Sequence, residues 1–282
     1  MQETTFNSDN QADGTVAFDD VKSWLDAHYL KSAPKKIEFD AFLDQIIKEV
    51  SFNRLEKNLH YQFSNPKNLV KALIQSTFSF ETFNEKSLSN ERLEFIGDSL
   101  INLLVGKNLF TLFKDLPEGE LSKLRGALVN EDQLAALAKS INLNSFVFVG
   151  KGEYRLQGNE KESILADAFE AVMAAIFLDA DEDFARLQMA FDKIIASFET
   201  ENEAYYELSR LEFFDPKSKL QELTMAQNGS MPIYRSSETG ENGNFKTEIL
   251  INDKVVSEII GNSKKKNEKK LAQKVISEKL FK

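Results

Sequence analysis

Apolar residues recur every three or four positions through most of the chain, which is the spacing of one face of a helix. The stretches with this period follow one another between residues 53 and 200: Leu69–Leu73, Arg92–Leu112, Leu121–Val129, Asp132–Lys139, Ile164–Phe177 and Phe184–Phe198. No convincing hairpin pattern interrupts them. We therefore predict an all-α domain over residues 51–200.

Residues 1–50 precede this domain as an extension. Residues 1–14 are polar and acidic and predict disorder. Helical spacing then predicts two short amphipathic helices, one within residues 16–30 and one within 37–50, separated by a break at Pro34. Their aromatic residues, among them Trp24, Phe39 and Phe42, are suited to packing on the helical domain, to extending a dimer interface or to binding a partner.

The period changes after residue 215, and the polar, acidic residues 201–214 form a connector to this tail. The tail predicts a helix, three strands and a second helix in the order Lys217–Ala226, Pro232–Ser236, Phe245–Ile251, Val255–Ile260 and a helix opened by Ser263. Asn252-Asp253 marks a turn between the last two strands. Residues 215–282 are therefore predicted to be an α+β domain with the order α-β-β-β-α.

The net charge of the whole chain argues against a nucleic-acid partner, but the distribution of charge along the chain weakens that argument. The 282 residues, enough for two domains, have a net charge of −10 and a pI near 5.0. The charge is uneven: residues 215–282 hold 13 Lys and Arg against 9 Asp and Glu, a net of +4. The remainder holds 22 against 36, a net of −14. The two parts are therefore expected to be different modules, and the tail is the candidate for binding anions.

Cysteine and histidine usage narrows the possible chemistry. The chain has no cysteine, which excludes disulfides, thiolate zinc sites and cysteine nucleophiles, and its only histidines are His28 and His60. Among the catalytic groups that remain possible, carboxylates that bind a hard metal ion are the first candidates. No stretch reaches the roughly 18 apolar residues of a membrane helix, and the start does not resemble a signal peptide, so we expect a protein of the cytoplasm without a membrane partner.

Carboxylates occupy one face of each of two apolar helices. Glu91, Glu94 and Asp98 are spaced i, i+3, i+7, within roughly 60° of one another around a helix, and Asp167 and Glu170 are spaced i, i+3. The apolar residues that follow each set predict that both helices are buried. Facing helices of this kind form an all-oxygen site that suits Mg²⁺ or Mn²⁺. The alternatives are a solvated acidic face, or ion pairs with a basic residue such as Arg92.

A lysine run begins the last predicted helix. Ser263 is a suitable N-cap, which places Lys264, Lys265 and Lys266 in the first turn. Cations there oppose the helix dipole, so the position favours a neighbouring anion such as a phosphate backbone. The alternative is a solvated lysine run without a ligand.

Four segments of the helical domain, in their order and separation, resemble the motifs of the ribonuclease III family. The segments are NERLEFIGDS (residues 90–99), PEGELSKLR (117–125), GKGE (150–153) and ESILADAFEAVMAAIFLD (162–179). The tail, from DPKSKLQE (215–222) to GNSKKKNEKKLA (261–272), resembles a double-stranded-RNA-binding domain. The resemblance covers residues 54–282 and leaves the extension outside.

The resemblance implies a homodimeric, all-α endonuclease domain followed by an α+β double-stranded-RNA-binding domain. It implies a magnesium-dependent endoribonuclease, with Mn²⁺ as a substitute, that cuts double-stranded RNA to 5′-phosphate and 3′-hydroxyl ends while processing ribosomal and other RNA precursors. Metal ligands fall on Glu94, Asp98, Asp167 and Glu170, and further acidic positions linked to catalysis fall on Glu91 and Glu118. Phe95 matches a dimer-interface position, for which core packing is the alternative.

The RNA contacts implied by the family are Ser218, Gln221 and Glu222 in the minor groove, together with the lysine run. Two departures from the family pattern stand out. Ile74-Gln75 replaces a threonine-histidine pair, which predicts altered local packing, and the loop of residues 240–245 is short and lacks the usual histidine. A non-catalytic RNA-binding or ribosome-associated relative is the alternative function, and an acidic helical scaffold protein is a third.

Overall fold

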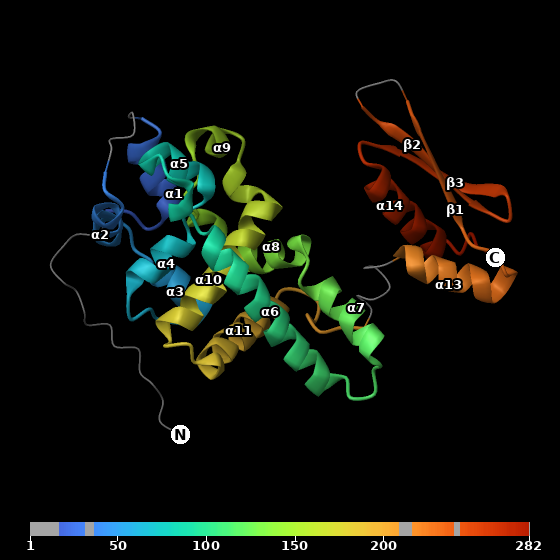
Figure 1. Ribbon diagram of the computed structural model, residues 1–282, viewed down its shortest axis with the longest axis horizontal. Helices are drawn as coiled ribbons and strands as arrows, with labels where there is room; N and C mark the ends of the chain where they lie inside the picture. Colours follow the sequence, from blue (N-terminus) through green and yellow to red (C-terminus); the bar gives the residue numbers. More distant parts are fainter. Residues whose placement is uncertain (1–16, 32–36, 209–215, 240–242, 282) are drawn as a thin grey trace. The chain divides into compact units, whose positions relative to one another are not determined.

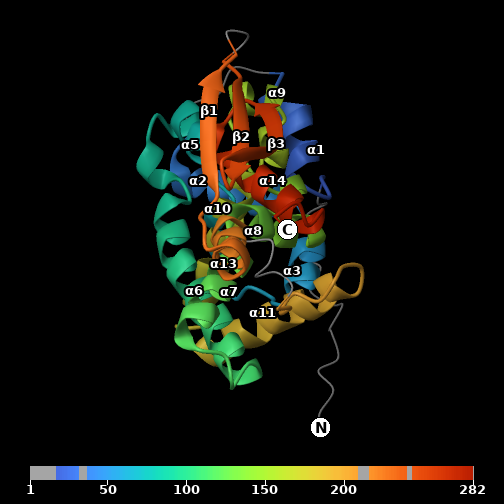
Figure 2. The ribbon, with the colours of Figure 1, turned by 90° about the vertical axis from the view of Figure 1, so that its right-hand side faces the viewer.

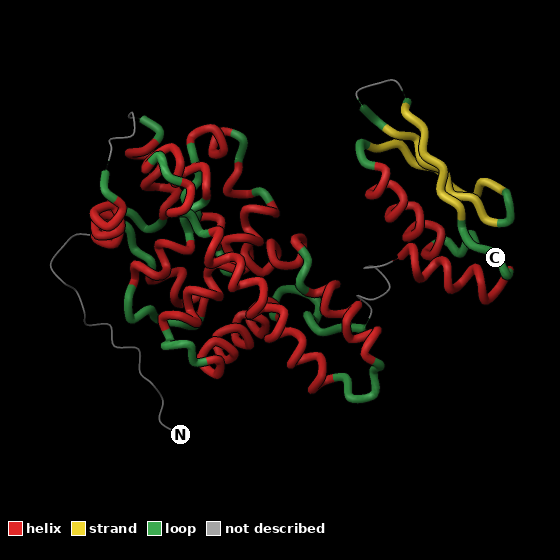
Figure 3. The backbone as a smooth tube through the Cα atoms, in the orientation of Figure 1, coloured by secondary structure: helices red, strands yellow, loops and turns green. Residues whose placement is uncertain are grey.

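A computed structural model describes residues 17–31, 37–208, 216–239 and 243–281. By its internal contacts the chain divides into two compact units, residues 1–112 with 128–205 and residues 113–127 with 206–282. Every strand of the described chain lies in the second unit, and the first unit is helical (Figure 3). The predicted fold class is confirmed, whereas the predicted disorder of residues 1–14 falls outside the described residues.

The first unit is built around α10 (Glu162–Asp179), whose residues are buried along most of its length. Four helices pack on α10 (Figure 1): α4 (Pro66–Ala72), α6 (Glu91–Leu112), α8 (Glu131–Ser140) and α11 (Phe184–Glu199). An apolar helix of this kind is stable only at the centre of a core, because it has no face suited to water. The sequence predicted all five of these helices.

Several short helical elements were not predicted: α3 (Asn53–Leu59), α5 (Ser76–Phe83), α9 (Lys151–Arg155), η2 (Lys86–Leu88), η3 (Leu143–Ser145) and η4 (Gly158–Glu160). Ile74 forms a parallel bridge with Phe148, and the next residue, Gln75, caps α5. The Gln75 carboxamide oxygen accepts the Thr77 backbone N–H at 2.7 Å. Gln75 thus has a local structural task of its own at the position where the family pattern has histidine.

The N-terminal extension packs on the helical unit. It contains α1 (Val21–Trp24), which continues as the wider turn η1 (Leu25–Tyr29), and α2 (Phe39–Glu49). The rings of Trp24 and Phe42 lie 6.0 and 5.6 Å from the ring of Phe148, and both residues are buried. Of the three uses predicted for these helices, packing on the helical domain is therefore the one observed within the chain.

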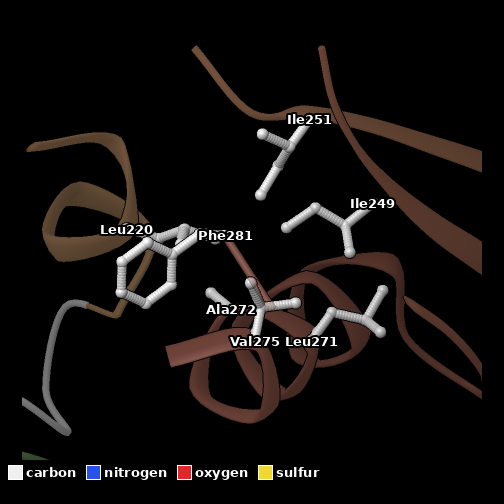
Figure 4. Close-up of a cluster of buried hydrophobic side chains, with 7 residues drawn as sticks. All are labelled: Leu220, Ile249, Ile251, Leu271, Ala272, Val275 and Phe281. Carbon is white, nitrogen blue, oxygen red and sulfur yellow. The ribbon is translucent and has the colours of Figure 1, made fainter. Parts of the chain in front are cut away.

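The second unit contains α13 (Pro216–Asn228), β1 (Ile233–Glu238), β2 (Phe245–Ile251), β3 (Lys254–Gly261) and α14 (Lys264–Ser277). The strands pair antiparallel in the order β1-β2-β3 (Figure 2). Side chains from both helices, from β2 and from the residues after α14 meet in one apolar cluster (Figure 4): Leu220, Ile249, Ile251, Leu271, Ala272, Val275 and Phe281. The α-β-β-β-α order agrees with the prediction, but the last helix, which the pattern extended to about Phe281, ends at Ser277.

Two connections follow from local chemistry. Asn252 and Asp253 both adopt positive φ (51° and 62°), as the two-residue turn of a tight hairpin between β2 and β3 requires. The predicted connector begins with an anchored residue: Tyr205 is fully buried, and its hydroxyl donates to the Leu128 carbonyl oxygen. In the described part of the chain, no helix combines the length and the apolar content that crossing a membrane requires.

Candidate active site

The two acidic helices of the first unit cross at Gly97 of α6. A Cβ atom built on Gly97 would lie 1.9 Å from the backbone oxygen of Glu170 in α10, so no other residue fits without moving the helices apart. Glu94 and Asp98 lie on α6 on either side of this point. The close approach of the two backbones is what brings the carboxylates of α6 next to those of α10.

Each helix contributes carboxyl groups whose pKa the other helix raises. The pKa of Glu170 rises to about 8, first because of burial and then because of the negative charges of Asp98, Glu94 and Asp167. The pKa of Glu94 is also raised, by burial first and then by Asp167, Glu91 and Asp98. The five predicted carboxylates Glu91, Glu94, Asp98, Asp167 and Glu170 are therefore neighbours, and we call them the acidic cluster.

In the described part of the chain, no Lys, Arg or His forms an ion pair with the acidic cluster. Among the described residues, none of the ion pairs involves any of its five members, and Arg92 is exposed without pairing to them. This contradicts the alternative in which Arg92 pairs with the cluster. Half-buried like charges without partners are unfavourable, so the arrangement favours an external cation.

Two residues near the cluster were missed by sequence reasoning. The Asn102 side-chain amide donates to Asp98 Oδ1 and to the Asp98 carbonyl oxygen, both at 2.9 Å, and so holds one carboxylate oxygen in place. Its i+4 spacing from Asp98 was the available signal. Glu131, the first residue of α8, adds to the raised pKa of Asp167, after burial and before Glu91. An acidic residue at a helix start is ordinary dipole compensation in a sequence, so Glu131 gave no distinct signal.

Glu118, the remaining predicted catalytic residue, belongs to the other compact unit. It is the first residue of α7 (Glu118–Leu128), and its carboxylate accepts a hydrogen bond from Ser122 Oγ at 2.9 Å. Residues 113–127 group with the second unit. The role of Glu118 therefore stays a prediction.

The donor set of the acidic cluster fits a hard divalent cation. All five side chains offer carboxylate oxygens, and neither sulfur nor imidazole lies among them, which matches the preference of Mg²⁺ or Mn²⁺. Within the described residues, the side chains do not yet converge as three or more ligands of one ion. The acidic cluster thus fits a divalent cation in the type of its ligand atoms and in its charge, and its carboxylates lie together at one helix crossing.

The second half of the α6 surface is unexpectedly apolar and exposed. Leu103 is 56% exposed and Phe110 75% exposed, so the prediction that this helix is buried all round was wrong. Together with Ile96, Ser99 and Gly106 they follow the i, i+3, i+7 pattern of a helix-pairing seam, with small residues at the intermediate positions. Such a seam allows close approach of another helix.

Phe95 is also exposed, by 75% of its surface, so core packing within its own chain is excluded for it. It adjoins Glu94 of the acidic cluster and Ile96 of the seam. An exposed phenylalanine next to an apolar seam is typical of a surface that binds another molecule, because an exposed side chain contributes little to folding.

The predicted RNA-binding residues lie on two helices of the second unit. Ser218, Gln221 and Glu222 share one face of α13, and the latter two are exposed. The lysine run Lys264–Lys266 occupies the first turn of α14, where Ser263 Oγ accepts the Lys266 backbone N–H at 3.4 Å. All three lysines are exposed, and in the described chain none of them forms an ion pair with a carboxylate.

Comparison with known proteins gives two family matches. Residues 65–197 match a family described as ribonuclease-III-like, and residues 216–279 match the double-stranded RNA binding motif. The chain is 38% identical over 227 residues to ribonuclease 3 of Campylobacter fetus subsp. fetus, covering 79% of this chain and 96% of the relative. It is 39% identical over 219 residues to ribonuclease 3 of Desulfotalea psychrophila, covering 76% of this chain and 87% of the relative.

A solved structure is also similar to part of the chain. The nuclease domain of ribonuclease III from Campylobacter jejuni is 41% identical, with a TM-score of 0.47, and the match covers 51% of this chain and 96% of that domain. The relatives therefore parallel both the helical unit and the α-β-β-β-α unit in sequence.

Proposed function

This chain belongs to the ribonuclease III family of endoribonucleases that act on double-stranded RNA, and we propose that it hydrolyses the phosphodiester bonds of that RNA with Mg²⁺ at the acidic cluster. Mn²⁺ would substitute for Mg²⁺. Glu94, Asp98, Asp167 and Glu170 would hold the ion, with Glu91 and Glu118 assisting. The observation that carries the proposal is the set of uncompensated carboxylates facing one another across the Gly97 crossing.

When bound, the metal would activate a water molecule and neutralise charge on the scissile phosphate. The contribution of the chain is to keep four carboxylates at one place, with Asn102 fixing the orientation of Asp98. The helix crossing holds the two backbones close together, so the carboxylates would converge on an ion by rotation of side chains and not by movement of the helices. We assign 5′-phosphate and 3′-hydroxyl products with short 3′ overhangs, and a role in processing ribosomal and other RNA precursors in the cytoplasm.

We further propose that the active form is a homodimer joined through the α6 seam and Phe95. The seam offers exposed apolar residues with small residues between them, which suits the same helix of a second copy related by a twofold axis. Burial of Leu103 and Phe110 on association would add roughly 1.5–3 kcal/mol for each fully buried side chain. Two copies would supply two acidic clusters, one for each strand of the duplex.

RNA would be held chiefly by the second unit. The exposed Lys264–Lys266 turn supports contacts with phosphates, and Ser218, Gln221 and Glu222 on α13 support contacts in the minor groove. Because the whole chain is acidic, affinity would depend on this basic surface and would fall steeply as salt rises.

The test is cleavage of a long RNA duplex by the purified chain with Mg²⁺. We expect short double-stranded products with 5′-phosphates, no cutting of single-stranded RNA, and no cutting in EDTA. Glu170→Gln and Asp98→Asn should each lower the cleavage rate by at least about 10³-fold, since the metal supplies several kcal/mol of transition-state stabilisation. Both variants should bind the duplex with unchanged affinity in Ca²⁺.

Glu162→Gln is the matched control, because Glu162 is an exposed glutamate on the same helix α10, outside the acidic cluster. It should cut at the wild-type rate. Duplex binding without any cutting by the wild-type chain would instead favour the non-catalytic relative. Normal cutting by Glu170→Gln would contradict the metal assignment alone.

A further inference from the structure

The first turn of α14 contains a buried amide among otherwise apolar buried positions. Asn267 is 3% exposed, and the other buried residues of this helix are Leu271, Ala272 and Val275. Removing an amide from water is unfavourable unless its hydrogen bonds are replaced. The position would suit a small apolar residue equally well for packing, so its polar group points to a more specific task.

The Asn267 amide is bonded to the end of the sheet. Its Nδ2 donates to the carbonyl oxygens of Phe245 (3.0 Å) and Gly261 (3.4 Å) and to Thr247 Oγ1 (3.3 Å). Phe245 begins β2, Gly261 ends β3, and the two residues pair in the sheet register. Thr247 Oγ1 in turn lies 2.9 Å from Ser236 Oγ of β1. One side chain of α14 thus connects to all three strands.

Gly261 makes room for this amide. A Cβ atom at Gly261 would lie 2.4 Å from Asn267 Oδ1. Any larger residue would displace the asparagine side chain or the strand end. Gly261 and Asn267 therefore form a fitted pair at the point where the sheet passes into α14.

The turn that this pair holds is the one that carries the lysine run. Asn267 directly follows Lys266, and the Lys264 ammonium group lies 4.7 Å from the centre of the Phe245 ring. The Phe245 backbone is itself bonded to Asn267. The next residue, Glu268, accepts a hydrogen bond from Lys217 Nζ of α13. The lysine turn is therefore fastened to the sheet by Asn267 and to α13 by Glu268.

We propose that Asn267 is a positioning residue for RNA binding: its amide fixes the lysine turn on the sheet, and together with the Glu268–Lys217 bond this sets the separation between the lysine turn and the RNA-facing side of α13. This inference rests on the proposed function of the second unit. A duplex presents its grooves at a fixed spacing, and a domain of this type spans about 16 base pairs, with contacts in two minor grooves and at the phosphates between them. Loss of the amide would weaken RNA binding that uses the lysine turn and α13 at the same time. It would leave binding through either element alone unchanged.

The test compares duplex lengths, with the full chain in EDTA so that no cutting occurs. One duplex has about 20 base pairs and admits both contact elements, and the other has about 8 and admits one of them. Asn267→Ala and Asn267→Leu should lower affinity for the long duplex about tenfold, which is about 1.4 kcal/mol. Affinity for the short duplex should change less than about twofold, since single contacts persist.

Thr247→Val is the matched control, because it removes one acceptor of the amide while the two carbonyl acceptors remain. It should bind both duplexes like the wild type. Gly261→Ala tests the same contact from its partner residue. Its methyl group would displace Asn267 Oδ1, so this variant should also lose affinity for the long duplex selectively. Thermal unfolding of each variant reports the folded fraction at the temperature of the binding measurement.

Equal losses on both duplexes, or losses that follow the unfolded fraction, would assign Asn267 a purely structural role and overturn the proposal. Wild-type affinity of both Asn267 variants for the long duplex would overturn it as well. A wild-type chain that binds neither duplex would contradict the proposed function of the second unit, which is a different failure.

Discussion

Two carboxylates of α10, one in the middle of the helix and one at its end, are in opposite electrostatic states. In the middle, Glu170 is half-buried, and within the described chain no hydrogen-bond donor reaches its side chain. At its end, Asp179 is buried and accepts four hydrogen bonds: from the hydroxyl of Tyr61 (2.9 Å), the backbone N–H groups of Ser64 (2.7 Å) and Asn65 (2.9 Å), and the side-chain amide of Asn68 (3.0 Å).

The pKa values follow from these surroundings. Burial pushes both carboxyl groups toward the neutral form. For Asp179 the four donors together outweigh burial, and its pKa lies below the ordinary value. For Glu170, burial and three neighbouring carboxylates act in the same direction and raise its pKa to about 8.

The difference separates a structural carboxylate from a candidate functional one. Asp179 has its partners within the fold and fastens the loop of residues 61–68 to the end of α10. Among the described residues, the charged groups that shift the pKa of Glu170 are all carboxylates, so its partner is left to be supplied from outside the fold. Uncompensated groups of this kind gather at functional sites, where they cost stability in the absence of a ligand.

The largest effect on stability should come from substitution of Asp179, the structural carboxylate. Asp179→Ala should lower the free energy of unfolding by roughly 3 kcal/mol, because buried donors lose a charged acceptor. In EDTA, Glu170→Gln should leave that free energy unchanged or raise it by up to about 1 kcal/mol, since a neutral glutamine avoids the unfavourable burial of an ionisable carboxyl group among other carboxylates. Denaturant unfolding of both variants at neutral pH measures the contrast.

Glu162→Gln again serves as the control, with an expected change within about 0.5 kcal/mol for an exposed residue. If Glu170→Gln destabilised the chain as much as Asp179→Ala did, Glu170 would have structural partners, and the distinction between these two carboxylates of α10 would be lost.

A smaller effect is expected in the pH dependence of stability without divalent cations. The lowered pKa of Asp179 contributes stability that is present above the unfolded value near 4 and is lost as pH falls through the folded value. The raised pKa of Glu170 acts the other way, so stability falls as pH rises from about 4.5 toward 8. Asp179→Asn should flatten the acid side of the profile and Glu170→Gln the neutral side.

Thermal unfolding at closely spaced pH values in EDTA gives these profiles. Parallel profiles for the wild type and Glu170→Gln between pH 5 and pH 8 would show that Glu170 titrates as in the unfolded chain. The same result for Asp179→Asn below pH 5 would show that the four hydrogen bonds do not shift the pKa of Asp179.

Much of the architecture was predictable, because it depends on periodicity. The apolar run of α10 and the i, i+3 spacing of Asp167 and Glu170 predicted both the central helix and the carboxylate pair. The change of period after residue 215 predicted the α-β-β-β-α unit. Ser263 was predicted as an N-cap, and its hydroxyl has that role.

The rest depends on contacts between residues distant in sequence. Gly97 looks like an unfavourable helix residue until the Glu170 backbone is seen against it. Asp179 looks like part of an exposed acidic stretch, and only the fold brings Tyr61 and Asn68 to it. The exposure of Leu103 was mispredicted, because an apolar seam for a second copy has the same composition as a core.

Binding of Mn²⁺, followed by electron paramagnetic resonance, tests directly whether the acidic cluster binds a divalent cation. The wild-type chain should bind Mn²⁺ without RNA, and Mg²⁺ should compete for the same site. Asp98→Asn and Glu170→Gln should each weaken Mn²⁺ binding by at least about tenfold, because each removes a carboxylate that would hold the ion. Glu162→Gln should bind Mn²⁺ like the wild type. Equal Mn²⁺ binding by the wild type and all three variants would contradict the account.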